Sequence, residues 1–368
     1  MKKLNSILFA IILLFTYNVQ YADAKSKIQV ALILDTSGSM DGLIEQAKTE
    51  LWKVVNELAV AKKDNLAPDL EIALYEYGKD AIPASQGYLK MLVPLSTDLD
   101  LISEELFKLT TNGGQEYCGM VIKRSLDELK WSTDNGDLKM IFIAGNEPFT
   151  QGSVDYKKSC ANAIAKGIVV NTIFCGNYQE GINTKWKDGA DLSDGKYLNI
   201  DHNKVVAQIS APQDQELIKL NEQLNKTYIG YGTAGIKYKA RQVQQDKNAS
   251  NLSVAVMAER AVTKSSKKYS NSSWDIVDAY ESAPESVEEM ESDEMPDEMK
   301  DLDSEERVEY IKEKKEERDK IQAKIQRLNK ERLEYIASER KKLAIDNTLD
   351  VVIIKAIHEQ ATTKRFKF

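Results

Sequence analysis

Cysteine and histidine, the residues behind many catalytic and zinc sites, are scarce in this chain. Its 368 residues include three cysteines and two histidines, and no cysteines form a C-x-x-C pair. Without that pair, the sequence does not support the usual zinc or thiol-redox motifs. His202 follows a predicted strand and His358 lies on the charged side of a predicted helix, where surface or capping roles are expected. The chain also lacks a G-x-S-x-G elbow and a glycine-rich phosphate loop, so we do not expect an enzyme.

Long apolar runs are equally rare, and the only long one lies near the N-terminus. Lys2 and Lys3 precede the apolar residues 7–15, and Ala22-Asp23-Ala24 offers a small-x-small cleavage site. Nine apolar residues are too few to span a bilayer. We therefore expect residues 1–24 to be a signal peptide and the protein to be exported, either periplasmic or secreted. We expect no integral membrane segment after signal cleavage.

An exported chain can form disulfides, and its odd number of cysteines would leave at least one thiol unpaired within the chain. Cys160, on a predicted helix, and Cys175, at the end of the next strand, are the first pair to test. The alternative is that Cys118 and the other two are small buried hydrophobic residues.

Positive charge does not dominate the chain, since 50 lysines and arginines face 58 acidic residues. A net charge of −8 argues against a nucleic-acid groove, so we expect no nucleic-acid partner. The acidic excess is concentrated in residues 281–306, which have few large apolar side chains. We expect an acidic linker over 281–303.

The first two hundred residues alternate strand-like apolar runs with helix-like amphipathic stretches. This alternation predicts an α/β domain over 25–210, with a doubly wound, mostly parallel sheet flanked by helices, as in Rossmann-like folds. The expected strands are 28–34, 70–77, 88–93, 140–144, 168–175 and 195–200. Ligands of such sheets bind beyond the carboxyl ends of the strands.

Beyond Pro212 the strand signals stop, which predicts an all-helical C-terminal region with long charged helices. We expect a helical region over 211–280, with one long helix from about 234 to 263. Residues 304–368 should form a charged helix to about Leu343, started by a capping box at Asp303 and Glu306, and then an amphipathic helix packed against it. The charged helix could pack on one side within the chain or form a coiled coil in a homo-oligomer.

One short motif carries most of the chemistry. Asp35-Thr36-Ser37-Gly38-Ser39-Met40 directly follows the buried strand 28–34 and precedes a helix. It places a carboxylate and two hydroxyls at alternate positions of a turn. These are hard oxygen ligands, which suit Mg²⁺, Ca²⁺ or Mn²⁺ rather than zinc.

This strand, D-x-S-x-S turn and helix resemble the metal-ion-dependent adhesion site of von Willebrand factor A (vWA) domains, and the resemblance covers about residues 26–210. It implies a magnesium cage with Asp35, Ser37 and Ser39 from the first loop. It also implies a threonine in the second loop and an aspartate in the third. Here Gln115 and Gly145 stand at those two positions.

Neighbouring residues of the same hard-oxygen type could replace the missing ligands. We expect Gln115 or Glu116 in the second loop, and Asn146 or Glu147 in the third, to complete a site for Mg²⁺ or Ca²⁺. The alternative is that the motif only caps the following helix and binds no ion.

The resemblance implies binding of another protein through the rim of the metal site. The expected rim residues are Met40, Asn112, Tyr117, Pro148 and Phe149. The alternative function is a structural or assembly factor with a vestigial site, which interacts through its C-terminal helices.

Overall fold

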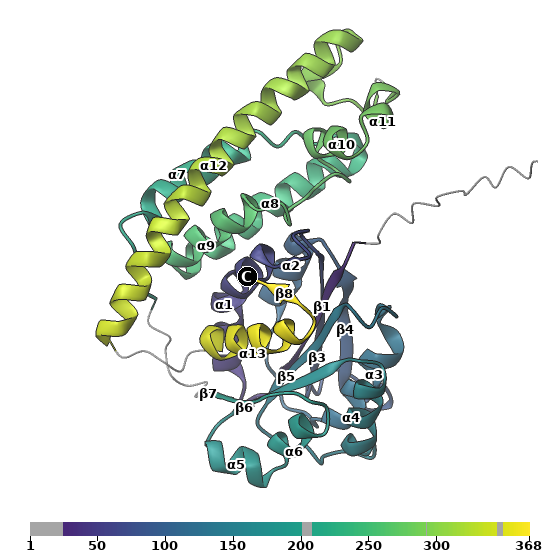
Figure 1. The fold of residues 1–368 in the computed structure, drawn as a ribbon. Helices are drawn as coiled ribbons and strands as arrows, with labels where there is room; N and C mark the ends of the chain where they lie inside the picture. Colours follow the sequence, from purple (N-terminus) through teal and green to yellow (C-terminus); the bar gives the residue numbers. More distant parts are fainter. Residues whose placement is uncertain (1–24, 201–207, 292, 344–348) are drawn as a thin grey trace, which may run out of the picture.

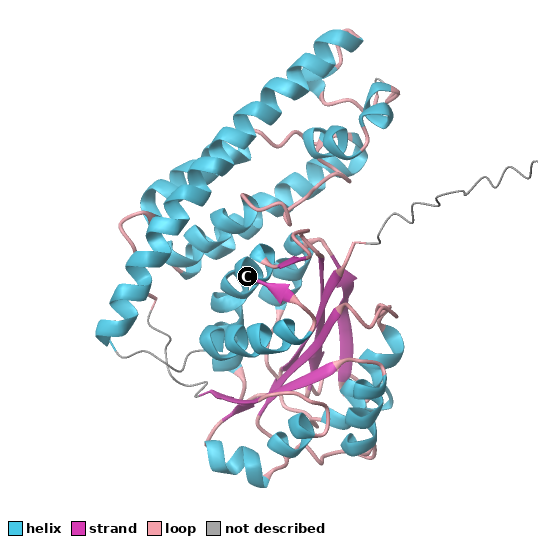
Figure 2. Cartoon of the chain, in the orientation of Figure 1, coloured by secondary structure: helices cyan, strands magenta, loops and turns pink. Residues whose placement is uncertain are grey.

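A computed structural model describes residues 25–200, 208–291, 293–343 and 349–368. The predicted signal peptide and His202 lie outside these ranges. The described chain forms an α/β unit with a group of long helices beside it (Figures 1 and 2). None of the described helices is both long enough and apolar enough to cross a membrane.

A six-stranded sheet forms the centre of the α/β unit, in the order β4-β3-β1-β5-β6-β7. The edge strand β4 runs antiparallel to β3, and all the other pairs are parallel. This topology confirms the predicted doubly wound sheet. The strands are β1 (Lys27–Asp35), β3 (Asp69–Tyr77), β4 (Leu89–Ser96), β5 (Leu138–Gly145), β6 (Val169–Cys175) and β7 (Tyr197–Ile200).

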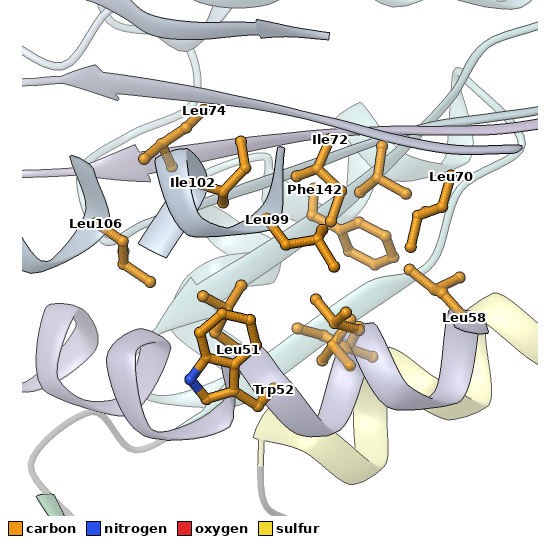
Figure 3. Packing of buried hydrophobic residues seen from close by; sticks show 14 of the residues in the cluster. Leu51, Trp52, Leu58, Leu70, Ile72, Leu74, Leu99, Ile102, Leu106 and Phe142 are labelled. Atoms are coloured by element: carbon orange, nitrogen blue, oxygen red, sulfur yellow. The ribbon is translucent and has the colours of Figure 1, made fainter. Parts of the chain in front are cut away.

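Helices cover both faces of this sheet because its central strands are apolar on both sides. One face packs on α1 (Asp41–Val60) and α2 (Leu99–Lys108), and Figure 3 shows Trp52 of α1 and Leu99 of α2 in one cluster with Phe142 of the sheet. The other face packs on α3 (Cys118–Glu128), α4 (Tyr156–Ala165) and α6 (Trp186–Asp191). The short α5 (Tyr178–Asn183) precedes α6.

All three cysteines are free and buried. Cys175 belongs to the core on the α1 side of the sheet, whereas Cys160 belongs to the core on the α3 side. The proposed Cys160–Cys175 pair is therefore wrong, because the two thiols belong to hydrophobic clusters on opposite faces. The alternative, small buried hydrophobic residues, is confirmed.

The long helix expected over 234–263 is two helices. Ser253 has an extended backbone (φ −172°, ψ 164°), and its Oγ accepts a hydrogen bond from the Val256 amide at 3.1 Å as the N-cap of the second helix. The helices of this region are α7 (Asp214–Asn225), α8 (Gly232–Leu252), α9 (Val254–Lys264), α10 (Ile276–Ser282), α11 (Pro284–Glu288) and α12 (Ser304–Leu343).

The acidic stretch 281–303 differs from the expected linker. Val287, Met295 and Met299 are buried in a small core together with Ile276 of α10 and Ile311 of α12. Methionine and valine thus fix this stretch to its neighbours although most of its residues are acidic. The short 3₁₀ helix Asp297–Met299 lies within it.

The capping box at the start of α12 is confirmed. Asp303 Oδ1 accepts hydrogen bonds from the amides of Glu305 and Glu306, and the Asp303 amide donates to Glu306 Oε2. The 40-residue helix then packs its apolar side, including Ile321 and Ile325, against α7 and α9 of the same chain. This is the one-sided packing that we considered beside a coiled coil.

The last helix, α13 (Leu349–Thr363), does not pack against α12 as expected. It lies on α1 and β7, and Gln360 Nε2 donates to Asn171 Oδ1 of β6 at 2.6 Å. Ile353 and Ile357 complete the core on that face of the sheet. An amphipathic stripe specifies that a helix is buried but not what it is buried against, which is why the sequence misplaced it. The helices α7–α12 are thus inserted before the last helix of the α/β unit.

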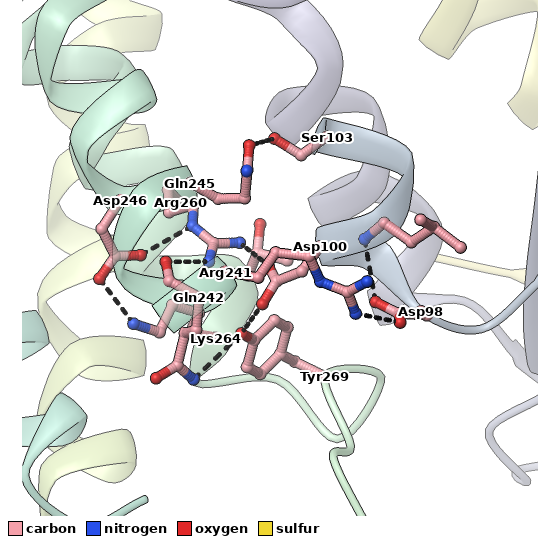
Figure 4. Close-up of polar contacts among 12 residues, drawn as sticks. Asp98, Asp100, Ser103, Arg241, Gln242, Gln245, Asp246, Arg260, Lys264 and Tyr269 are labelled. Atoms are coloured by element: carbon pink, nitrogen blue, oxygen red, sulfur yellow. Dashed lines mark hydrogen bonds and ion pairs between the residues drawn. The ribbon is translucent and has the colours of Figure 1, made fainter. Parts of the chain in front are cut away.

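A buried ionic network joins the inserted helices to α2 (Figure 4). Arg260 of α9 pairs with Asp100 of α2 at 2.7 Å and with Asp246 of α8 at 2.8 Å, and its side chain is fully buried. Lys264 pairs with the same Asp246 at 2.9 Å. Tyr269 donates to Asp100 at 2.6 Å. Charges buried in this way require their partners, so the inserted helices are fixed to the α/β unit.

Candidate metal centre

The D-x-S-x-S turn lies at the carboxyl edge of the sheet. Asp35 is the last residue of β1 and pairs with Tyr77 at the end of β3. Its carboxylate is fully buried, and Oδ1 accepts a hydrogen bond from the Ser37 amide at 2.7 Å. Ser37 Oγ lies 3.4 Å from Ser39 Oγ. Helix α1 starts after Met40 with no side-chain cap, so these hydroxyls are not its N-cap.

The second loop brings Glu116, not Gln115, to Asp35. Glu116 is buried, whereas Gln115 is exposed. Gly78, at φ +80°, directly follows β3 and lies against the second loop. A Cβ on Gly78 would lie 2.7 Å from both Asp35 Oδ1 and Glu116 Cγ. Only glycine leaves room for the two carboxyl groups, which are therefore adjacent. Glu116 was among the expected ligands, whereas nothing in the sequence singled out Gly78.

Each of the two carboxyl groups keeps one buried oxygen without a hydrogen-bond partner in the described part of the chain. Within the described residues, Asp35 Oδ2 and Glu116 Oε2 are buried atoms with no hydrogen-bond partner. Burial raises the pKa of Asp35, although hydrogen bonds from Ser37 oppose the shift. Burial, the Asp35 charge and the Glu147 charge raise the pKa of Glu116. A bound cation would remove this penalty because it compensates both charges.

In the third loop a tyrosine occupies the space of the missing aspartate. A Cβ on Gly145 would lie 2.4 Å from Tyr77 Oη and 3.0 Å from Asp35 Oδ2. Tyr77 is buried, and its hydroxyl donates to the Ala144 carbonyl at 3.0 Å. Tyr77 was not among the expected site residues, because a tyrosine at the end of a buried strand gives no signal beyond ordinary core packing.

The neighbouring candidates of the third loop differ in position. Asn146 Nδ2 donates to Ser39 Oγ at 3.1 Å, and its buried Oδ1 has no hydrogen-bond partner among the described residues. Asn146 thus lies with the serines of the first loop. Glu147 is exposed, and its backbone carbonyl accepts a hydrogen bond from Trp186 Nε1.

Two of the five expected rim residues are wrong. Met40 and Phe149 are fully buried, and the Phe149 ring packs edge-on against Trp186 at 5.0 Å. Both side chains fill the core behind the loops, Met40 on the α1 side of the sheet and Phe149 on the α3 side. Asn112, Tyr117 and Pro148 are exposed or partly exposed.

The donor set fits a hard divalent cation rather than zinc. Asp35, Glu116, Ser37, Ser39 and the amide oxygen of Asn146 are all oxygen donors, as Mg²⁺ and Ca²⁺ prefer. In the described part of the chain, no three His, Cys, Asp or Glu side chains gather around one point. A cation here would therefore rest on two carboxylates together with hydroxyl and amide oxygens.

Neither a protein-family model nor a curated protein sequence matches this chain. Solved structures similar to it include BatB from Bacteroides thetaiotaomicron, which is 15% identical over 47% of this chain and 90% of that one, with a TM-score of 0.36. The SpRpn10 VWA domain is 15% identical over 47% and 87%, also at 0.36. Proximal thread matrix protein 1 from the mussel byssus, solved with a zinc-occupied MIDAS motif, is 12% identical over 49% and 43%, at 0.36.

The α/β unit is vWA-like. The reason is its own topology: the doubly wound, mostly parallel sheet and the position of the D-x-S-x-S turn after β1 both agree with the predicted resemblance. This vWA-like unit is made of residues from the first two hundred together with α13, and the helices α7–α12 are an addition to it.

Proposed function

We propose that this protein binds a partner protein through a divalent cation, Mg²⁺ or Ca²⁺, at the carboxyl edge of its vWA-like sheet. The observation that supports this most is the pair of adjacent buried carboxyl groups, each with an oxygen that lacks a hydrogen-bond partner. Burial and the neighbouring charge raise the pKa of Glu116 to about 9, so ionising both groups without a cation is electrostatically unfavourable.

In this proposal Asp35 and Glu116 hold the ion, with Ser37, Ser39 and Asn146 as neutral ligands. A bound cation would offer a coordination position for an acidic oxygen of the partner. Because the cage would have two carboxylates of its own, the ion would attract that oxygen less strongly than an ion held by neutral ligands. Asn112, Tyr117 and Pro148 then provide the surrounding contact surface.

We also propose that the protein acts after export, in the periplasm or outside the cell. The inserted helices would hold the vWA-like unit in position, since the buried network at Arg260 fixes them to α2. No step of this function requires a catalytic base or nucleophile.

Calorimetric titration with Mg²⁺ and Ca²⁺ tests the proposal. Wild-type protein should release or absorb heat with at least one ion, and Asp35→Asn and Glu116→Gln should abolish it. Asp127→Asn is the matched control, because Asp127 is an exposed aspartate on α3 and should leave binding unchanged. If wild type binds neither ion, the site is vestigial, and the assembly function through the helices becomes the better explanation.

A further inference from the structure

A two-stranded ribbon lies far from the metal centre. It consists of β2 (Lys62–Lys63) and β8 (Phe366–Lys367), which pair antiparallel beside the N-terminal ends of the parallel strands. Helix α1 starts at the metal centre and ends next to β2. Its 20 residues span about 30 Å, so the ribbon and the metal centre lie at opposite ends of the α/β unit.

The ribbon places positive charges next to one another. Lys62 and Lys367 are exposed and directly opposite each other, and neither has an ion-pair partner within the described ranges. Like charges at such positions repel. Arg365 is also exposed, at 75%, with Asp64 3.6 Å away as its acidic neighbour. The repulsion between these like charges is unfavourable in the free protein, and an anionic partner would relieve it.

Large apolar side chains surround these charges. Leu66, Val60 and Phe368 are 64%, 53% and 40% exposed. Leu66 belongs to the turn after β2, where its backbone is hydrogen-bonded to that of Lys63. The Phe368 ring follows β8 and stacks on His358, with the centroids 4.1 Å apart. Exposed apolar and basic residues thus occur on the same short ribbon.

Other charged groups near the ribbon do not cancel its positive charge. Lys268 reaches the Pro68 carbonyl and Lys364 reaches the Asn135 carbonyl, so two further cations lie close by. The acids near the ribbon are Asp64, at Arg365, Glu57, which contacts His358, Asp134, near Lys63 at Gly136, and Asp69, which pairs with Lys25. Neither Lys62 nor Lys367 has an ion pair with any of these acids in the described part of the chain. The rest of the chain is acidic, with a net charge of −8 overall. This basic and apolar surface is therefore a local exception.

We infer that the surface formed by Lys62, Leu66, Arg365, Lys367 and Phe368 docks on an anionic phospholipid membrane. Lysine and arginine bind the negative headgroups, while leucine and phenylalanine enter the interface below them. Docking through this end would turn the metal centre away from the lipid and toward a partner. The inference does not depend on metal binding at Asp35.

Co-sedimentation with vesicles tests this inference. The folded protein should bind vesicles of equimolar phosphatidylglycerol and phosphatidylcholine, and it should bind pure phosphatidylcholine much less. Each lysine near an anionic surface contributes about fivefold in affinity at low salt. Reversing both charges in Lys62→Glu/Lys367→Glu should therefore lower binding at least about tenfold, and Leu66→Ser/Phe368→Ser should lower it several-fold.

Lys237→Glu/Lys247→Glu on α8 is the control, because both lysines are exposed and the same change in net charge then falls outside the proposed surface. It should bind as wild type does. Equal loss in this control, or equal binding of wild type to both kinds of vesicle, would overturn the inference. So would tighter binding to an acidic protein or a nucleic acid than to the anionic vesicles. Thermal unfolding of each variant checks that the fold is retained, and calorimetry with Mg²⁺ checks the metal centre separately.

Discussion

Replacing Asp35 with asparagine should stabilise the protein when no divalent cation is present. The change removes a buried negative charge next to Glu116 and keeps the side-chain oxygen that accepts the Ser37 amide hydrogen bond. Loss of a charged acceptor that stabilises its own turn would have the opposite effect. The same substitution therefore distinguishes an ion cage from a carboxylate that only holds the turn.

The expected gain follows from the pKa of Asp35. Burial raises this pKa from 3.8 to about 7. An acid whose pKa is raised by folding favours the folded state below its unfolded pKa, and this contribution is lost as the pH rises through the folded value. Full ionisation of Asp35 thus costs on the order of 4 kcal/mol above pH 7. Because the asparagine amide must itself find a partner, we expect a net gain of about 1–3 kcal/mol.

Chemical denaturation at pH 8, in EDTA and then in Mg²⁺ or Ca²⁺, measures this effect. In EDTA the Asp35→Asn protein should unfold at higher denaturant than wild type. An ion at a hundred times its dissociation constant stabilises the folded wild type by about 2.7 kcal/mol and leaves the variant unchanged. The advantage of the variant should therefore shrink or reverse when the ion is added.

A variant that is less stable than wild type in EDTA would refute this reasoning. It would mean that the Asp35 carboxylate stabilises its loop as a charged acceptor, and that its buried oxygen is compensated in solution. An unchanged difference between the two proteins in EDTA and in either ion would separately refute the cage. Asp127→Asn should show neither effect.

Three further results are expected. In EDTA the wild-type melting temperature should fall from pH 5 to pH 9 as the carboxyl pair ionises, and Mg²⁺ affinity measured by calorimetry should rise over the same range. Gly145→Asp should not restore a ligand. It should lower the free energy of unfolding by about 2 kcal/mol, because the new Cβ would collide with the Tyr77 hydroxyl. The control Gly38→Ala should be tolerated, because the nearest atom to its Cβ, the Gly113 amide nitrogen, would lie 3.6 Å away. Arg260→Met should cost about 3–5 kcal/mol in denaturation, against less than about 1 kcal/mol for the surface residue in Lys187→Met.

The sheet was predictable because each strand carries its own pattern. Apolar runs of strand length, separated by amphipathic stretches, define a parallel sheet with two covered faces whatever the rest of the chain does. The capping box of α12 was predictable for the same reason, since Asp303 bonds to amides within three residues of itself.

The helical region was harder because its contacts are not local. The apolar stripe of α13 matched a helix, but only the uncovered core beside α1 decided where that helix lies. The break at Ser253 depends on one side chain that prefers to cap rather than continue a helix. The acidic stretch was misjudged by composition, because three buried apolar side chains fix it.

At the candidate metal centre the sequence identified the three loops, but not which residue of each loop faces the site. Whether Gln115 or Glu116 faces the site depends on a one-residue choice in a loop, and no periodicity constrains that choice. Gly78 and Gly114 decide it, since a Cβ on Gly114 would lie 2.4 Å from the Gly78 carbonyl oxygen, so that the second loop packs directly on the end of β3. Glu116 is the residue that this packing buries.

The absence of an aspartate at Gly145 does not by itself mean that the site has lost a carboxylate. The resemblance implies two carboxylates, one in the first loop and one in the third. This chain also has two, but the second is Glu116, and the hydroxyl of Tyr77 fills the space near Gly145. We propose that the second carboxylate is displaced toward the second loop rather than lost. This would account for two carboxyl groups that are buried together, each with one oxygen that has no hydrogen-bond partner among the described residues.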